Sequence, residues 1–186
     1  AQVATAPAGP FTDLSWTMTG PSTPTASSPV FTFVQISSLT ANWTAGDNPN
    51  LGNNLQFTTQ MSSGAFPNSF SGNVGITTVG LSAIFGAGGT GSVSPNTTYY
   101  FQTAAANITS TSAFISLGST SSLAALPTGV SFGVVNSTSI ALSWSGASNG
   151  VGTVFTVIYS TASNPSSPSG AAVTSSATLN TSLTAP

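Results

Sequence analysis

Only two side chains of this chain carry a charge near neutral pH, the carboxylates of Asp13 and Asp47. The 186 residues include no Lys, Arg, His, Cys or Glu. General acid–base catalysis near pH 7 usually uses His, a tuned carboxylate, Lys or Cys. Nucleophilic Ser or Thr needs a neighbouring base, which His or Lys would normally supply. We therefore predict that the chain is not an enzyme and has no catalytic residue.

The two carboxylates are also too few to build a binding site for a metal. Asp13 and Asp47 lie in segments that we expect in different structural units, so a glycosidase-type pair is not expected. Zinc needs Cys, His or carboxylate ligands. The segment Asp47–Asn50 offers oxygen atoms, but calcium sites gather several carboxylates, and Asx residues stabilise turns directly. We interpret Asp47–Asn50 as a turn and predict no metal and no cofactor.

The charge balance restricts the partners further. Nucleic-acid binding requires Lys or Arg against phosphate, and a membrane-spanning helix requires about 18 consecutive apolar residues; the sequence has neither. A formal net charge of −2 gives copies of the chain little reason to repel one another, which favours association. An apolar content of 39% with low net charge also argues against disorder. The expected partners are therefore copies of the chain itself.

The elements that must position these side chains have the pattern of β-strands. Apolar and polar residues alternate along Leu39–Thr44, Tyr99–Ala104 and Phe155–Ser160, so one set of side chains faces a core. Clusters of Gly, Pro, Asn and Ser separate such runs at spacings of roughly 8–12 residues, which is typical of a sandwich or barrel. We predict an all-β fold. Its core residues include Trp43, Trp144, Tyr99 and Phe101.

An internal repeat divides the chain. Ser37–Thr44 resembles Ser137–Ser145, which places Trp43 and Trp144 about 101 residues apart. Phe11–Thr17 resembles Phe114–Thr120 at an offset of about 103 residues, and Ala177–Pro186 resembles Ala83–Pro95. These matches predict an N-terminal strand segment over residues 1–28, a sandwich over 29–125 and an incomplete sandwich over 126–186.

The repeated motifs resemble the fibronectin type III family of bacterial extracellular type. The marks are L-T-A-N-W at Leu39–Trp43, I-A-L-S-W at Ile140–Trp144, and the turn and strand Ser94–Asn107. The resemblance implies tandem immunoglobulin-like β-sandwiches. It also implies that Tyr99 is a corner tyrosine, whose hydroxyl binds the backbone. In this alignment the second sandwich lacks its last two strands, F and G.

Three explanations of the unfinished sandwich stay open. The sequence is a window of a longer array, or a neighbour's N-terminal segment completes the sandwich, or the last strands pair differently within the chain. Strand donation has a candidate segment, because Leu14, Trp16 and Met18 lie on one face of an expected strand. That segment resembles a G strand, and a G strand is one of the two that the second sandwich lacks. These three residues are the expected interface strand; the alternative is that residues 11–19 close the first sandwich of their own chain.

We expect an extracellular or cell-surface structural protein, the subunit of a filament, sheath or surface array. Sandwich packing, with strand donation as one route, would assemble it. The alternative is an adhesin stalk or a carbohydrate-binding accessory module of a secreted protein. Glycans are further expected partners, because Asn-x-Ser/Thr motifs for N-glycosylation occur at five positions. They are Asn42, Asn96, Asn107, Asn136 and Asn180.

Overall fold

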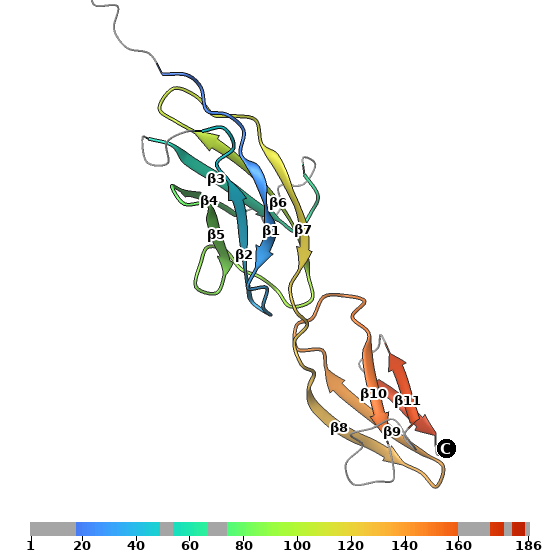
Figure 1. The fold of residues 1–186 in the computed structure, drawn as a ribbon. Coiled ribbons are helices and arrows are strands. Elements are labelled where there is room, and N and C mark those ends of the chain that lie inside the picture. The colour runs from blue at the N-terminus through green and yellow to red at the C-terminus, as the bar shows by residue number, and fades with distance from the viewer. Residues whose placement is uncertain (1–17, 49–53, 67–73, 160–171, 177–179, 185–186) are drawn as a thin grey trace, which may run out of the picture.

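A computed structural model describes residues 18–48, 54–66, 74–159, 172–176 and 180–184 of the chain. All regular structure in these ranges is β-strand, arranged as two sandwiches joined end to end (Figure 1). Neither sandwich, within the described ranges, contains a helix long and apolar enough to cross a membrane. The predicted all-β fold of tandem sandwiches is confirmed.

Seven strands form the first sandwich. They are β1 Thr25–Thr32, β2 Ser38–Thr44, β3 Gln56–Ser62, β4 Val74–Thr78, β5 Ser82–Gly86, β6 Thr98–Ala106 and β7 Ile115–Ser121. One sheet has the order β1-β2-β5 and the other β4-β3-β6-β7, with every pair antiparallel. The first strand begins at Thr25, before the expected boundary at residue 29.

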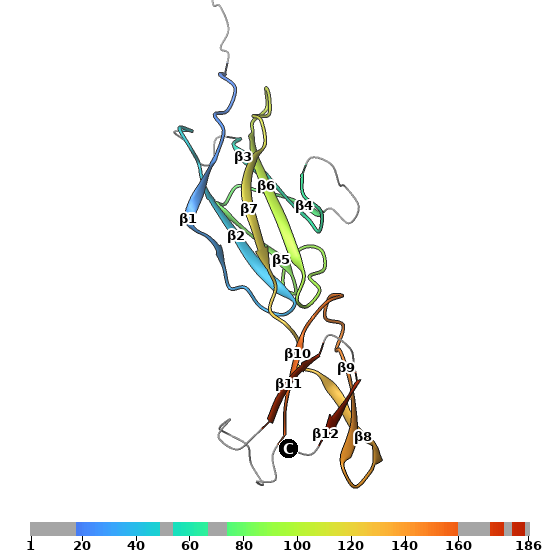
Figure 2. The same ribbon diagram turned by 90° about the vertical axis from the view of Figure 1, so that its right-hand side faces the viewer.

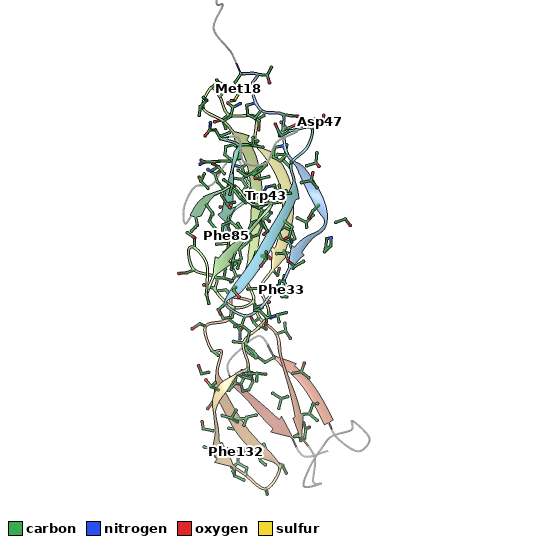
Figure 3. The ribbon with its side chains drawn as sticks, turned by 60° about the vertical axis from the view of Figure 1, so that its left-hand side comes forward. Met18, Phe33, Trp43, Asp47, Phe85 and Phe132 are labelled. Atoms are coloured by element: carbon green, nitrogen blue, oxygen red, sulfur yellow. The ribbon has the colours of Figure 1, made fainter. Side chains whose placement is uncertain are left out.

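The core of the first sandwich follows the alternation of its strands. Leu39, Ala41 and Trp43 of β2 point inward and are buried, while Thr40 and Asn42 between them are half-buried on the other face. Aromatic rings meet across the two sheets, as side-chain burial between packed sheets requires. Trp43 lies 6.0 Å from Phe57, measured between ring centroids, and Phe85 lies 5.4 Å from Phe101. Figure 3 shows Trp43 and Phe85 between the sheets.

Five described strands form the second sandwich. They are β8 Thr128–Val135, β9 Ser139–Ser145, β10 Phe155–Tyr159, β11 Ala172–Ser176 and β12 Asn180–Thr184. One sheet has the order β12-β9-β8 and the other consists of β10-β11 (Figure 2). These pairings reproduce β5-β2-β1 and β3-β4. In the part of the chain that the structure describes, no strand corresponds to β6 or β7, as the sequence alignment predicted for strands F and G.

The ladder of β12 corrects one part of the repeat alignment. Ile140 pairs with Leu183, as Leu39 pairs with Phe85 in the first sandwich. Thr181–Leu183 therefore takes the place of Ala83–Phe85, and the expected match of Ala177–Leu179 to that strand is wrong. Residues 177–179 lie outside the described ranges. The error arises because this segment is rich in Ser, Thr and Ala and contains no aromatic residue to fix the alignment.

Candidate functional site: the open face of the second sandwich

The first sandwich shows what normally covers its first strand. Phe31 of β1 packs against Phe101 of β6, with ring centroids 5.0 Å apart. Val30 and Val34 also pack against the core and are half-buried. Strand β6 is thus the element that brings apolar surface to β1 from the opposite sheet. Phe101 itself is fully buried between Phe31 and Phe85.

In the second sandwich the counterpart of β1 is β8, and its side chains are exposed. Phe132 of β8 pairs with Leu142, as Phe31 pairs with Ala41, so Phe132 occupies the position of Phe31. Its side chain is nevertheless 72% exposed, and Val135, which corresponds to Val34, is 65% exposed. Every residue of β8 is exposed. We call the apolar side chains of β8, together with the edge of β10 described next, the open face. The apolar members are Val130, Phe132 and Val135.

The open face also includes a strand edge. In the first sandwich β3 pairs with β4 on one side and β6 on the other. Its counterpart β10 pairs with β11, and no described strand lies along its other side. An edge of this kind offers backbone N–H and C=O groups to an added strand. The open face thus combines a hydrogen-bonding edge with an uncovered apolar strand.

The core behind the open face is small. Leu142 and Trp144 are its buried members, and Phe155, Val157 and Tyr159 of β10 pack against them half-buried. Trp144 meets Phe155 edge to face at 5.8 Å, which repeats the contact of Trp43 with Phe57. The two sandwiches therefore share the contact between the Trp strand and the strand after it. They differ in the opposite sheet, where β6 and β7 complete the first sandwich and no described strand completes the second.

The joint between the sandwiches is built around Asn149. Its side-chain Nδ2 donates to the carbonyls of Ala125 and Gly146, and its Oδ1 accepts the Ala125 N–H at 2.8 Å. Asn48 makes the same three bonds in the first sandwich, with Ser22 in place of Ala125 and Ala45 in place of Gly146. We call this arrangement the asparagine clamp. It fastens the chain that enters a sandwich to the turn after the Trp strand.

Direct contacts between the two sandwiches complete the joint. The Gly150 N–H donates to the carbonyl of Pro95 at 3.3 Å, and Asn96 Nδ2 donates to Thr153 Oγ1 at 2.7 Å. A Cβ added at Gly150 would lie 2.9 Å from the Asn96 oxygen, so the close approach requires glycine. The Leu123 N–H donates to the carbonyl of Gln35, which anchors the linker to the first sandwich.

The predicted core residues lie as follows. Trp43 is 2% exposed, Phe101 is fully buried and Trp144 is buried in the small second core. Tyr99 is buried, and its hydroxyl accepts the backbone N–H of Ser94 at 2.8 Å. That bond spans the turn before β6, which is the geometry of a tyrosine corner. Sequence reasoning did not find the clamp residues Asn48 and Asn149, although each lies five residues after its Trp.

The predicted interface strand lies mostly outside the described residues. Leu14 and Trp16 fall in the range that the structure does not describe. Met18 is described and half-buried, and Figure 3 places it at the end of the first sandwich that faces away from the second. The chain reaches the first sandwich through Thr19, whose carbonyl accepts a hydrogen bond from Asn107 Nδ2 at 2.9 Å.

The five predicted glycosylation positions differ in their surroundings. Asn42 Nδ2 donates to the Val30 carbonyl and to Thr32 Oγ1, so the atom that would carry a sugar holds two strands together. Asn107 Nδ2 donates to Thr19 as described above, and its Oδ1 accepts the Thr109 and Ser110 N–H groups. Asn96 and Asn136 are exposed, and their Nδ2 atoms donate to Thr153 Oγ1 and Ser139 Oγ. The backbone of Asn180 lies in β12.

The electrostatics of the open face are simple. Asp47 is the only charged side chain in the described ranges, and it is exposed at the far end of the first sandwich (Figure 3). Asn48, its neighbour, uses its amide in the clamp. Residues 49 and 50 of the expected turn lie outside the described ranges. No group of three metal-ligating side chains occurs among the described residues. The site can therefore offer apolar surface, backbone hydrogen bonds and the hydroxyls of residues such as Ser131 and Thr156, without a charged group.

Comparison with known proteins supports the fold. A two-domain fibronectin type III segment of chicken tenascin matches 88% of this chain and 83% of its own length, with a TM-score of 0.53 and 14% identity. The FN1–FN3 domains of chicken CNTN1 match 89% of this chain and 56% of their own, with a TM-score of 0.37 and 17% identity. No family model and no curated protein matches the sequence. The chain has a fibronectin type III-like fold, in two tandem domains.

Proposed function

We propose that the chain is a structural subunit of an extracellular or cell-surface filament, sheath or array, assembled from copies of itself by sandwich packing and strand donation. The open face carries this proposal. It exposes Phe132, Val130 and Val135 of β8 beside the edge of β10. Large exposed apolar patches usually mark interaction sites, and an uncovered strand edge invites strand addition.

The nearly uncharged surface favours the same function. Without Lys, Arg or His, copies approach one another with little repulsion, and contacts between them need no charge to be desolvated. The end-to-end joint of the two sandwiches adds an elongated unit of the kind that repeats well. Glycans on exposed positions such as Asn136 would keep such a surface soluble.

The alternative function, a carbohydrate-binding module, requires aromatic rings that share one exposed face. The exposed Phe side chains among the described residues are Phe33 and Phe114 of the first sandwich and Phe132 of the second (Figure 3). Phe132 thus has no exposed Phe beside it on the open face. The adhesin-stalk alternative uses the same tandem, and it predicts a dispersed monomer rather than a polymer.

Electron microscopy of the native material and of the purified chain tests the proposal. We expect regular fibres or sheets with a short axial repeat, and assembly that is unchanged in 0.5 M salt, because no charge pair supports it. Phe132→Asp should abolish assembly. Phe33→Asp is the matched control, since it changes an equally exposed Phe outside the open face. Dispersed monomers of wild-type mass would contradict the proposal.

A further inference from the structure

We infer that residues 1–18 of one copy supply two strands to the second sandwich of another copy, at the positions where the described residues contain no strand. Residues 1–6 would take the position of Phe101–Ala106 in β6, and residues 11–18 that of β7. This inference rests on the proposed function and names the partner that fills the open face. The occupant is a segment of a second copy of this chain.

The asparagine clamp fixes the register of residues 11–18 relative to a sandwich. Ala125 and Ser22 are the clamped residues, and they lie about 103 residues apart. The similarity between Phe11–Thr17 and Phe114–Thr120 has the same offset. The chain that enters the second sandwich through Ala125 has just left β7. By the same register, the chain that enters the first sandwich through Ser22 has just left residues 11–18.

Residues 1–6 extend the match to the preceding strand. Gln2-Val3-Ala4-Thr5-Ala6 resembles Gln102-Thr103-Ala104-Ala105-Ala106 of β6, at an offset of about 100 residues. The connection between the two segments is shorter than the β6–β7 loop by three residues, a change that surface loops tolerate. Residues 1–18 therefore carry counterparts of Phe101–Ala106 of β6 and of the whole of β7, in the correct order. Ala1 takes the position of Phe101, so the ring that covers β8 must come from residues 11–18.

One paired position supports this assignment independently. Thr59 of β3 and Thr103 of β6 face each other in the buried core and share a hydrogen bond of 2.8 Å. Phe155 repeats the contact of Phe57 with its Trp, so Val157, two residues further along, takes the position of Thr59.

In the inferred β6 segment, Val3 takes the position of Thr103. Both members of the pair are thus Val where both were Thr. Such a joint change suits a contact pair, because a buried hydroxyl opposite Val would lose its partner.

The face of the donated strand also fits. Leu14 takes the position of Leu117, which is buried in the first sandwich. The next residue of β7 is Gly118, whose φ of 90° accompanies a register shift in the ladder. Ser15 stands at that position in the donated strand and disfavours a positive φ. Leu14, Trp16 and Met18 then stay on one face and cover the apolar side chains of β8.

The donor must be a different copy of the chain. Leu14 precedes Met18 by four residues, a reach of about 14 Å. Met18 lies at the far end of the first sandwich from β8 (Figure 3). Strand β6, with nine residues, alone spans about 30 Å of that sandwich. Leu14 therefore cannot reach the open face of its own chain, and head-to-tail completion between copies follows.

Disulfide trapping tests the inference without background, because the chain has no Cys. Val3→Cys and Val157→Cys proteins are purified separately, mixed and oxidised, and we expect a covalent dimer joining one copy of each. Ile158→Cys is the matched control, since it lies next to Val157 on the opposite face and should yield at least tenfold less dimer with Val3→Cys. A mixture in which both pairs react equally, or neither reacts, would overturn the inference.

A second measurement separates this inference from the proposed function. In the full chain carrying Leu14→Asn and Trp16→Asn, we expect association to weaken on the order of 100-fold or more, because polar groups would enter the core. A synthetic peptide of residues 1–20 should bind this variant and raise its Tm. Thr17→Asn, on the opposite face, is the control and should assemble like the wild type.

The outcomes distinguish the two proposals. Fibres that persist in the double variant, without peptide binding or cross-linking, would overturn strand completion and leave the filament function intact. Cross-linked dimers and peptide binding with no fibres in the native material would support strand completion and overturn the filament function. A cross-link within a single chain carrying both Cys would overturn completion between copies.

Discussion

The two sandwiches place a phenylalanine at the same position of the same strand and treat it differently. Phe31 of β1 packs on Phe101 and is half-buried, whereas Phe132 of β8 is 72% exposed. Both pair with the equivalent residue of the neighbouring strand, Ala41 and Leu142. The difference comes from the opposite sheet, because β6 covers β1 and no described strand covers β8. Burial in a sandwich thus depends on the partner sheet and not on the strand's own sequence.

Removing the covering ring should affect the first sandwich most. We expect Phe101→Ala to destabilise it by about 3–5 kcal/mol, because the ring is fully buried between Phe31 and Phe85. Urea unfolding followed by tryptophan fluorescence would measure the loss. Phe31 should then become as solvent-accessible as Phe132. A loss below about 1 kcal/mol would contradict the view that β6 provides this cover.

The asparagine clamp occurs in both sandwiches, so its removal compares them directly. Asn149→Ala should cost about 1–3 kcal/mol in the second sandwich, because the N–H and carbonyl of Ala125 and the carbonyl of Gly146 lose their partner. Asn48→Ala should have a similar cost in the first. Asn149→Ala should also loosen the angle between sandwiches, which small-angle scattering would detect. Asn136→Ala, at an exposed turn, is the control.

One turn residue with a positive φ is Gly in the first sandwich and Ala in the second, so a substitution there should stabilise the second sandwich. Gly46 has a φ of 64°, and its counterpart Ala147 has a φ of 51°. Since a left-handed conformation costs an L-residue roughly 1 kcal/mol, Ala147→Gly should stabilise the second sandwich by up to that amount. Thermal unfolding would measure it. The reverse change, Gly46→Ala, should destabilise the first sandwich, because a Cβ there would lie 2.2 Å from the Thr23 oxygen.

The smallest effect on the free energy of unfolding is expected at Phe132. Phe132→Ala should change the stability of dilute monomer by less than about 0.5 kcal/mol, because the ring is mostly exposed there. In assembled material the same change should cost several times more. Unfolding measured below and above the concentration of assembly would give both values. Equal values in the two states would mean that nothing covers Phe132.

The sequence predicted the features that large, distinctive residues mark. The spacing of Trp43 and Trp144 gave the repeat, and the Ser94–Asn107 motif gave the position of Tyr99, whose hydroxyl the structure places on the Ser94 N–H. It failed for β12, because Ser, Thr and Ala look alike at many offsets. The clamp was missed because Asn in a turn is common, and two of its three bonds reach a chain segment more than 20 residues away.

The joint between the sandwiches has a geometric consequence. Gly150, Thr153 and the clamp fix one rotation and one translation from the first sandwich to the second. When two unlike surfaces meet and the same operation is applied again at each junction, the product is a ring or an open helix. The hydrogen bonds at Pro95 and Asn96 belong to the junction within one chain, because Pro49 and Gly52, at the positions of Gly150 and Thr153, have neither the N–H nor the hydroxyl to repeat them. A junction between copies would share the clamp alone, so a polymer would alternate two unlike junctions along its length.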